Sequence, residues 1–305
     1  MNADQLVHIV VVTYNRIELT RQCLPSLKRC ADHPHVLSVV DKGSQDGTRE
    51  YLRELQKQGL VDNVFLLSRN MGISCAANFG WAALDAPFSL RVDNDMLFKR
   101  PGWLSRMVAL CARNPEIGML ALHYTANEFD TIRLRSGDVA CLRPGLGCPG
   151  CCTLIRRDVH ERLGFWCEDY GLYGEEDADY SHRALLAGLV CAYLPTEDGA
   201  ALDIDCVEHK GGFAAPRNEY ETFKCSKRSK NVDPFGNYSV NLMLYGLRRR
   251  ELHMPRKYLP RLNPDGTYSF QVDPGYRPYE TKLSLYKRMF KLGGLDRTLA
   301  GAAKA

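Results

Sequence analysis

The sequence predicts an α/β fold with a mostly parallel sheet flanked by helices, and two observations support this prediction. Short runs of β-branched and other apolar residues, the first at His8–Val12, alternate with amphipathic stretches of helical length. The runs are apolar at consecutive positions, which is typical of strands buried on both faces of a parallel sheet. Strands and helices that alternate in this way form a parallel sheet with helices on both faces.

The predicted elements follow one another regularly through residues 1–216. Strands are expected at His8–Val12, Val36–Val40, Val64–Leu67 and Phe88–Val92, with helices between them at Leu19–Cys30, Arg49–Gln58 and Ser74–Leu84. Farther along, we expect helices at Gly102–Asn114 and Arg157–Leu163, and strands at Ile117–Leu122, Gly150–Ile155 and Cys191–Leu194. A further helix follows Gly174, and its acidic first turn suits the positive end of the helix dipole, which is sufficient to explain Glu175 and Asp179.

The alternation stops beyond Arg217, so residues 217–305 are predicted to form a basic, partly helical C-terminal extension. This extension contains 18 Lys and Arg against 8 Asp and Glu, a net charge of +10, whereas residues 1–216 carry −6 of the overall +4. Such a basic segment favours an anionic partner, for example phosphate groups or a membrane surface. A lid and an oligomer contact are competing roles for the extension, and no nucleic-acid partner is expected.

Three segments of the extension carry local predictions. Asn237–Arg250 is expected to be helical, and Pro255–Tyr279, rich in Pro, Tyr and Gly, is expected to wrap the surface irregularly. Leu283–Leu292 is predicted to be a short basic amphipathic helix. Such a helix can lie among lipid headgroups or pack on the body of the protein, and both interpretations stay open.

The composition is that of an ordinary globular protein, with 45% apolar and 25% charged residues. No run of about 18 apolar residues is present, so no spanning helix is expected. The first strand-like run begins by Val7 with no basic segment before it, and a signal peptide is therefore not expected. These features predict a cytoplasmic protein, with peripheral contact at the inner face of the membrane if the extension binds lipid.

Twelve cysteines are distributed along the chain without the spacing of a small disulfide scaffold. Most stand in apolar or helical surroundings, where a thiol packs as a small hydrophobic group. Cys148, Cys151 and Cys152 are the exception, because the first two form a Cys-x-x-Cys pair that is half of a zinc site. No second pair at suitable spacing and no His-x₃-His completes it, so structural zinc is disfavoured.

Polar residues cluster where each of the first four predicted strands ends. The clusters are Thr13–Arg16, Asp41–Asp46, Arg69–Gly72 and Asp93–Asp95. Ligands of open α/β sheets bind beyond the carboxyl ends of the strands, so we expect the four clusters to form one site. This convergence is the main functional inference from the pattern of elements.

Asp93 and Asp95 follow the fourth strand with one residue between them. At this spacing both carboxylates lie on one side of an extended chain and can hold a hard divalent cation. Asp and Asn are also common turn residues, and only the convergence of the four clusters favours a site over an acidic turn. No Gly-rich dinucleotide or P-loop signature is present, so a bound diphosphate would need another source of positive charge, such as a cation held by Asp95.

These segments resemble, in order, the nucleotide-binding blocks of family 2 glycosyltransferases with the GT-A fold. The matching blocks are Ile9–Arg16, Val40–Thr48, Arg69–Gly72 and Val92–Asp95. Gly174–Arg183 resembles the later Glu-Asp block of this family, and Glu208-His209 resembles its late metal-binding histidine. The resemblance covers about residues 7–212, and it makes residues 1–216 the expected GT-A catalytic domain.

The resemblance implies a role for each matching residue on the donor side. Thr13, Asp41 and Arg69 would contact the base and ribose of the nucleotide, usually uridine in this family, and Asp93 would lie near the ribose. Asp95 would bind Mn²⁺ or Mg²⁺ with His209 as a second protein ligand. Apart from the resemblance, a single His in a Gly-flanked loop is usually a solvated side chain.

On the acceptor side, the resemblance implies that Asp177 is the catalytic base and that Glu176 orients the acceptor. The sequence departs from the family pattern at Lys42, where Asn is common. It also lacks the Gln-x-x-Arg-Trp motif of processive synthases, because its only tryptophans are Trp81, Trp103 and Trp166. Transfer of one sugar at a time is therefore expected.

The function predicted in this way is metal-dependent, inverting transfer of one sugar from a nucleotide-diphosphate sugar, most often a UDP-sugar, to a hydroxyl of a glycan or lipid-linked acceptor. Assembly of bacterial surface polysaccharide or glycolipid is the expected setting. The alternative is a non-catalytic nucleotide-sugar-binding module with the same fold. A sugar-phosphate nucleotidyltransferase would need a Gly-rich basic loop after the first strand, which Thr13–Arg16 does not supply. The sugar and the acceptor are not identified, because acceptor loops such as Tyr124–Pro149 carry no recognisable pattern.

Overall fold

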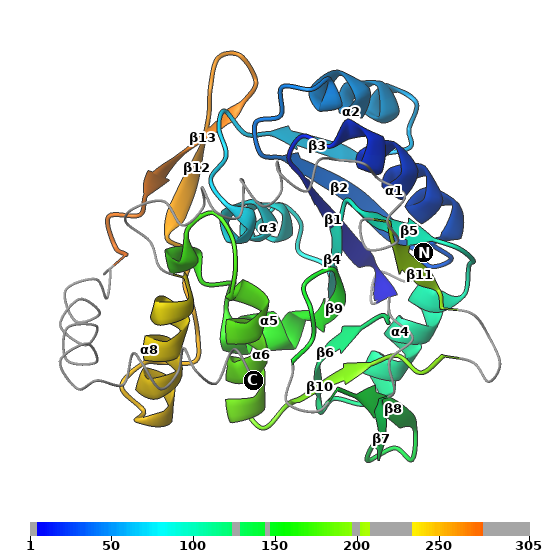
Figure 1. The fold of residues 1–305 in the computed structure, drawn as a ribbon, viewed down its shortest axis with the longest axis vertical. Helices are drawn as coiled ribbons and strands as arrows, with labels where there is room; N and C mark the ends of the chain where they lie inside the picture. Colours follow the sequence, from blue (N-terminus) through cyan, green and yellow to red (C-terminus); the bar gives the residue numbers. More distant parts are fainter. Residues whose placement is uncertain (1–4, 124–128, 144–146, 197–201, 208–233, 277–305) are drawn as a thin grey trace.

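A computed structural model of the chain describes residues 5–123, 129–143, 147–196, 202–207 and 234–276. In this part, a nine-stranded mixed sheet has the strand order β3-β2-β1-β4-β9-β6-β10-β8-β7 (Figure 1). The strands are β1 (Val7–Thr13), β2 (His35–Asp41), β3 (Asn63–Leu66), β4 (Phe88–Asp93), β6 (Ile117–Ala121), β7 (Asp130–Arg133), β8 (Val139–Leu142), β9 (Cys152–Arg156) and β10 (Val190–Tyr193). Strands β1 to β4 are parallel, and β9 lies antiparallel between β4 and β6.

Helices cover both faces of the sheet and create two cores. On one face, α1 (Ile17–Cys30), α2 (Thr48–Lys57) and α4 (Trp103–Arg113) contribute to the larger apolar cluster. On the other face, α3 (Ile73–Ala82), α5 (Arg157–Leu163) and α6 (Glu176–Leu186) contribute to the second cluster. All seven residues of β1 are buried between these layers, as expected of a central parallel strand covered on both sides. The predicted α/β sheet with helices on both faces is confirmed.

The described part of the extension packs on this body. Helix α8 (Pro234–Gly246) lies beside α6 and the short 3₁₀ helix η2 (Glu168–Tyr170). A hairpin of β12 (Tyr258–Leu262) and β13 (Tyr268–Val272) lies against α3 (Figure 1). Phe79 of α3 meets both Tyr268 and Phe270 of the hairpin, with ring centroids 4.8 and 5.5 Å apart.

Several predictions for the segments were wrong. Pro255–Tyr279 is not irregular, because it contains the β12–β13 hairpin. The predicted helix Asn237–Arg250 ends at Gly246. Arg248 has a left-handed φ of 53°, which is incompatible with a right-handed α-helix. Tyr124–Pro149, treated as loops, contains the paired strands β7 and β8. Two short strands not anticipated, β5 (Met96–Phe98) and β11 (Ile204–Cys206), pair with each other.

Other predictions fall outside the described residues. These include the helix Leu283–Leu292, the residue His209 and the boundary between residues 216 and 217. The division into a catalytic domain and an extension stays a prediction, as do the lid, membrane and oligomer roles. Within the described ranges, no helix is long and apolar enough to cross a membrane. The cysteines described there are free thiols, and Cys148, Cys151 and Cys152 are buried.

Candidate active site

The register of the sheet brings three of the predicted clusters to one edge. Thr13 at the end of β1 is the partner of Asp41 at the end of β2. On the other side of β1, Val12 is the partner of Asp93 at the end of β4. The carboxyl ends of these three parallel strands are therefore level, and this edge is where the sequence places the nucleotide.

Asp41 is the most completely bonded carboxylate of this edge. It is fully buried. Its Oδ1 atom accepts hydrogen bonds from the hydroxyls of Thr13, at 3.2 Å, and Ser44. Its Oδ2 atom accepts from the backbone N–H groups of Gly43 and Ser44 and from Nε of Arg49, at 3.1, 2.9 and 3.1 Å. Five donors fill the acceptor capacity of a carboxylate, so Asp41 organises the loop after β2. Its contact with a nucleotide base stays a prediction.

The loop after β1 is tied to the loop after β2. The backbone N–H of Asn15 donates to Oγ of Ser44 at 2.7 Å, and the N–H of Ile17 donates to Asp46 at 2.9 Å. Asn15 and Arg16 both have left-handed φ angles, 52° and 64°. Such angles cost on the order of 1 kcal/mol each in residues other than glycine and persist where the surroundings impose them. The strained turn holds Arg16 beside the site, with its Nη1 4.0 Å from Oδ2 of Asp95.

A buried arginine connects the donor and acceptor sides of the site. The Arg91 guanidinium, in β4, donates one hydrogen bond to Oδ1 of Asp93 and another to the carbonyl of Gly150. The N–H of Gly150 in turn donates to Oδ2 of Asp177 at 3.0 Å. Arg91 also stacks on the Trp166 ring at 4.9 Å. Although burial lowers it, the pKa of Arg91 is held above its ordinary value by the carboxylates around it. Asp93 and Asp177 are thus linked by one chain of hydrogen bonds.

Gly150 is the residue that makes this link possible. A Cβ atom at this position would lie 2.4 Å from Nη1 of Arg91 and 2.7 Å from the Trp166 ring. Any larger residue would push Arg91 or Trp166 away, or would shift the backbone at position 150. A shift of that backbone would displace the N–H that holds Asp177. Neither Arg91 nor Gly150 was predicted as a site residue. A charged residue within the apolar run Leu90–Val92 was the available signal for Arg91.

Glu176 and Asp177 lie in the first turn of α6, directly after Glu175, which has a left-handed φ of 67°. Asp177 is half-buried, and its second oxygen, Oδ1, accepts from the N–H of Ala178 at 2.8 Å. Glu176 is only 6% exposed, and no described residue forms a hydrogen bond with its Oε2 atom. Burial, reinforced by the Asp177 carboxylate, raises the pKa of Glu176 to about 7, and Arg91 opposes this rise. In this pair, Asp177 is held in place by two backbone N–H groups, and Glu176 has a pKa near neutral pH.

Helix α6 is fixed by a buried ion pair between Asp179 in its first turn and Arg183 one turn farther along. Asp179 and Arg183 are both fully buried and lie 2.8 Å apart. Asp179 also accepts hydrogen bonds from the hydroxyls of Tyr170 and Tyr245, and Arg183 donates to three backbone carbonyls. From the sequence alone, the helix dipole is sufficient to explain Asp179. The structure shows a further role, because the Asp179 carboxylate joins α6 to the C-terminal extension.

Asp95 lies in the turn between β4 and β5, with its side chain 13% exposed. The pairing of β5 with β11 brings a distant segment to it, because the N–H of Val207 donates to the carbonyl of Asp95 at 3.0 Å. Val207 precedes His209 by two positions in the sequence. Within the described residues, no group of three His, Cys, Asp or Glu side chains gathers in a way that would hold a metal ion.

The loop after β3 completes this edge. Arg69 is exposed, and its backbone lies against Gly43. Gly72 has a φ of 92° and packs so closely on Gly171 that a Cβ would lie 2.3 Å from the carbonyl oxygen. The N–H of Ile73 donates to the carbonyl of Leu172 at 3.2 Å. These contacts join the predicted nucleotide side to the segment that leads into Glu176.

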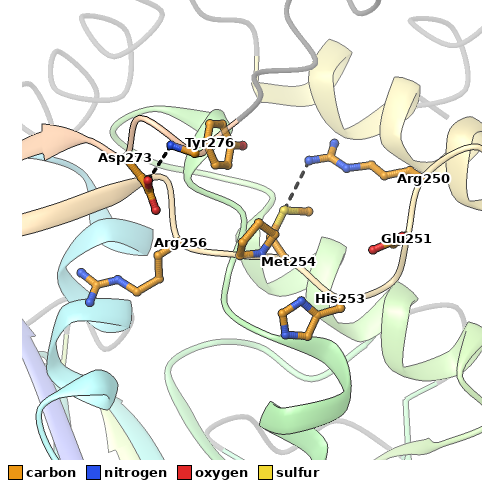
Figure 2. A pocket seen from close by; sticks show the side chains of 9 residues that line it. Arg250, Glu251, His253, Met254, Arg256, Asp273 and Tyr276 are labelled. Carbon is orange, nitrogen blue, oxygen red and sulfur yellow. Dashed lines mark hydrogen bonds between the residues drawn. The ribbon is translucent and has the colours of Figure 1, made fainter.

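A separate cavity of about 260 Å³ lies between the end of α8 and the hairpin (Figure 2). Arg250, His253, Met254, Arg256 and Tyr276 are among the residues that line it. Arg250 donates to the sulfur of Met254 at 3.3 Å. The cavity shares no residue with the strand-end cluster, so it does not serve the predicted donor site.

The level strand ends, the antiparallel β9 beside β4 and the helices on both faces define a GT-A fold. The chain belongs to glycosyl transferase family 2, because the model of that family matches residues 8–164, half of the chain. The protein is therefore a glycosyltransferase, and the resemblance seen in its sequence is confirmed. Among curated proteins, no sequence match is found.

Solved structures with similar folds are glycosyltransferases. The mannosyltransferase PcManGT from Pyrobaculum calidifontis, in complex with GDP-Man and Mn²⁺, has a TM-score of 0.52 at 17% identity, and the match covers 98% of this chain and 75% of that one. S. aureus TarS 1–349 in complex with UDP has a TM-score of 0.50 at 15% identity, with coverage of 89% and 98%. GalNAc-T7 with UDP, GalNAc and Mn²⁺ has a TM-score of 0.50 at 16% identity. That match covers 63% of this chain and only 42% of GalNAc-T7. At these identities the likeness concerns the fold.

Proposed function

We propose that this glycosyltransferase moves one sugar, with inversion, from a nucleotide-diphosphate sugar to an acceptor hydroxyl, and that it needs a divalent cation. The observation that supports this most directly is the chain of hydrogen bonds from Asp93 through Arg91 and Gly150 to Asp177. It holds a donor-side carboxylate and a potential base together at the carboxyl edge of the sheet, where ligands of open α/β folds bind.

The nucleoside is assigned to the edge formed by β1, β2 and the loop after β3. Thr13 and Asp41 fix the floor of this edge, while the exposed Arg69 is available for contact with the base or ribose. Asp93 is assigned to the ribose. UDP-sugars are the proposed donors, in keeping with the uridine nucleotides in the complexes of TarS and GalNAc-T7. The GDP-Man complex of PcManGT makes GDP-sugars the second class to test.

The cation is assigned to Asp95 and His209, with Mn²⁺ or Mg²⁺ as the candidates. The residues fit such a group, because an Asp oxygen is a hard ligand and because cations that bridge a diphosphate often use only one or two protein carboxylates. The absence of a three-residue ligand cluster among the described residues agrees with a site that the substrate completes. When bound, the cation would stabilise the negative charge of the departing diphosphate.

Asp177 is assigned as the general base. It removes the proton of the acceptor hydroxyl as the acceptor oxygen bonds to the anomeric carbon. The bond between that carbon and the diphosphate oxygen breaks on the opposite face, which inverts the configuration. An ordinary Asp has a pKa of about 3.9 and is a weak base, so its contribution depends on position. The N–H groups of Gly150 and Ala178 supply that position.

Glu176 is assigned to the acceptor. Its Oε2 atom has no hydrogen-bond partner among the described residues, and an unpartnered buried oxygen is costly unless a ligand satisfies it. An acceptor hydroxyl next to Asp177 would do so. We further propose transfer of single sugars to a glycan or lipid-linked acceptor in surface-glycan assembly, with peripheral membrane contact through the basic extension.

A panel of UDP- and GDP-sugars tests the function directly. The purified protein should release nucleotide diphosphate from one donor in the presence of Mn²⁺, and much less after chelation. An array of glycan acceptors with that donor should then show transfer. Donor binding without hydrolysis or transfer to any acceptor would contradict the enzyme assignment and favour a non-catalytic sugar-nucleotide-binding module.

A further inference from the structure

Lys42 is a buried lysine at the predicted donor site. It follows Asp41 at the end of β2, and its backbone N–H donates to the carbonyl of Thr13 at 2.9 Å. The residue is only 5% exposed. Its Nζ atom lies 5.6 Å from the centre of the Tyr14 ring. The side chain therefore stays at the carboxyl edge of the sheet. A surface lysine, in contrast, extends into solvent.

The ammonium group of Lys42 has no acceptor among the residues that the structure describes. No described residue forms a hydrogen bond or an ion pair with it. The three nearby arginines differ in this respect, because Arg49 pairs with Asp41, Arg91 with Asp93, and Arg16 lies 4.0 Å from Asp95. Lys42 is partly desolvated, and its three N–H donors have the Tyr14 ring but no described acceptor beside them, an arrangement that a ligand oxygen would improve.

Charged groups from both sides of the site act on the Lys42 ammonium. Burial lowers the pKa of Lys42 to about 8, and the Arg91 guanidinium contributes to this effect. Asp93, Glu176 and Asp41 act in the opposite direction. The ammonium is thus within electrostatic reach of Asp93, assigned to the ribose, and of Glu176, assigned to the acceptor. The diphosphate of a nucleotide sugar connects these two positions.

We propose that Lys42 binds the diphosphate of the sugar-nucleotide donor. This inference rests on the proposed function, because it takes the strand-end cluster as the donor site. A phosphate oxygen supplies the missing acceptor and the missing negative charge in one contact, and charge-assisted hydrogen bonds of this kind are the stronger ones. Lys42 then contributes positive charge to the diphosphate in addition to the cation assigned to Asp95.

Binding of uridine, UMP and UDP to Lys42→Met tests this inference, because the three ligands differ only in phosphate. Calorimetric titration of K42M should show UDP bound about tenfold more weakly than by wild type, with uridine changed less than twofold. Lys42→Arg, which keeps the charge, should recover most of the UDP affinity. Lys57→Met, at an exposed position in α2, is the matched control and should bind all three ligands like wild type.

The contrary results are distinct. Equal weakening of uridine and UDP in K42M, or no weakening of either, would overturn the diphosphate contact, and so would a loss seen only with UDP-sugars and not with UDP. A lower thermal unfolding temperature of K42M with unchanged UDP affinity would make Lys42 a structural counter-ion instead. The same titrations with guanosine, GMP and GDP cover the second donor class. If wild type binds neither UDP nor GDP, the proposed function itself fails, and this inference fails with it.

Discussion

Asp41 and Glu176 are both buried carboxyl groups near the carboxyl edge of the sheet, yet their surroundings are opposite. Asp41 accepts hydrogen bonds from five donors, which come from the end of β1, the loop after β2 and the first turn of α2. Glu176 has one oxygen without a partner among the described residues. The first carboxylate belongs to a finished scaffold, whereas the second is available to a proton or a ligand.

The same contrast separates the two sides of the site. On the donor side, the hydrogen bonds that join the loops after β1 and β2 span 29 positions. The acceptor side depends on contacts over long sequence separations, because α6 is fixed through Tyr245 and the carbonyl of Leu252 in the extension. The nucleotide side is therefore held by contacts between neighbouring strands and loops, whereas the geometry of the acceptor region is set by more distant parts of the chain.

The largest expected effect concerns turnover on the acceptor side. Asp177→Asn should lower transfer by about 10²- to 10⁴-fold, because Asn cannot take the acceptor proton. The Asn oxygen can still accept the N–H of Gly150, so donor affinity should stay within about twofold. Steady-state rates and UDP titrations check both statements. Asp158→Asn, at a largely exposed position in α5, is the control, and residual D177N turnover near wild type would remove Asp177 from the role of base.

A second large effect is expected in stability on the donor side. Asp41→Asn should destabilise the protein by about 3–5 kcal/mol, because it leaves Arg49 without its charge partner and turns an amide N–H₂ group toward hydrogen-bond donors. Denaturant unfolding measures this change. Asp85→Asn, whose side chain is 82% exposed, should change stability by less than about 1 kcal/mol. If D41N unfolds like D85N, Asp41 does not organise the loop.

The contrast between local and distant contacts also explains what the sequence could predict. Thr13, Asp41, Asp93 and Asp95 were predictable as a group, because each follows a parallel strand whose apolar run is easy to recognise. Gly150 was not, since its role depends on Arg91, 59 positions away. His209 lies outside the described residues, and the roles of the predicted site residues stay predictions.

The hairpin in the extension was missed for another reason. Asp265-Gly266 is a turn signal, and the residues Tyr268 to Val272 alternate between apolar and polar, so the pattern of a hairpin was present. The Pro, Tyr and Gly content of the whole segment Pro255–Tyr279 favours an irregular structure and obscures this pattern. Its packing on Phe79 could not be foreseen, because α3 presents an apolar surface that only the folded chain shows to be covered.

A smaller effect is expected where the two sides meet. Gly150→Ala places a Cβ atom 2.4 Å from Nη1 of Arg91, and relief of such a clash typically costs about 1–3 kcal/mol. Because Arg91 and Asp177 share Gly150, turnover should fall more than donor affinity does. Unfolding and steady-state measurements give both values. Gly246→Ala is the matched control, because a Cβ there has no atom within 4 Å, and equal behaviour of the two variants would contradict a role for Gly150 in the link.

Glu176 should give the stability of the protein a pH dependence of its own. Its pKa is raised from 4.5 to about 7, so the folded protein binds this proton more tightly than the unfolded chain does. Between these two pH values the folded state holds more protons, and stability must fall as the pH rises.

Glu176→Gln cannot ionise and should lack this contribution. The variant should therefore gain stability relative to wild type as the pH rises from about 4.5 to about 7, and the difference should be constant above pH 7. Denaturant unfolding of both proteins over this range measures the difference directly, and the shared groups that do not interact with Glu176 cancel. A difference that does not change with pH would mean that the folded protein leaves Glu176 ionised like an ordinary surface carboxylate. The buried carboxyl beside Asp177 would then resemble Asp41 more closely than its missing hydrogen-bond partner indicates.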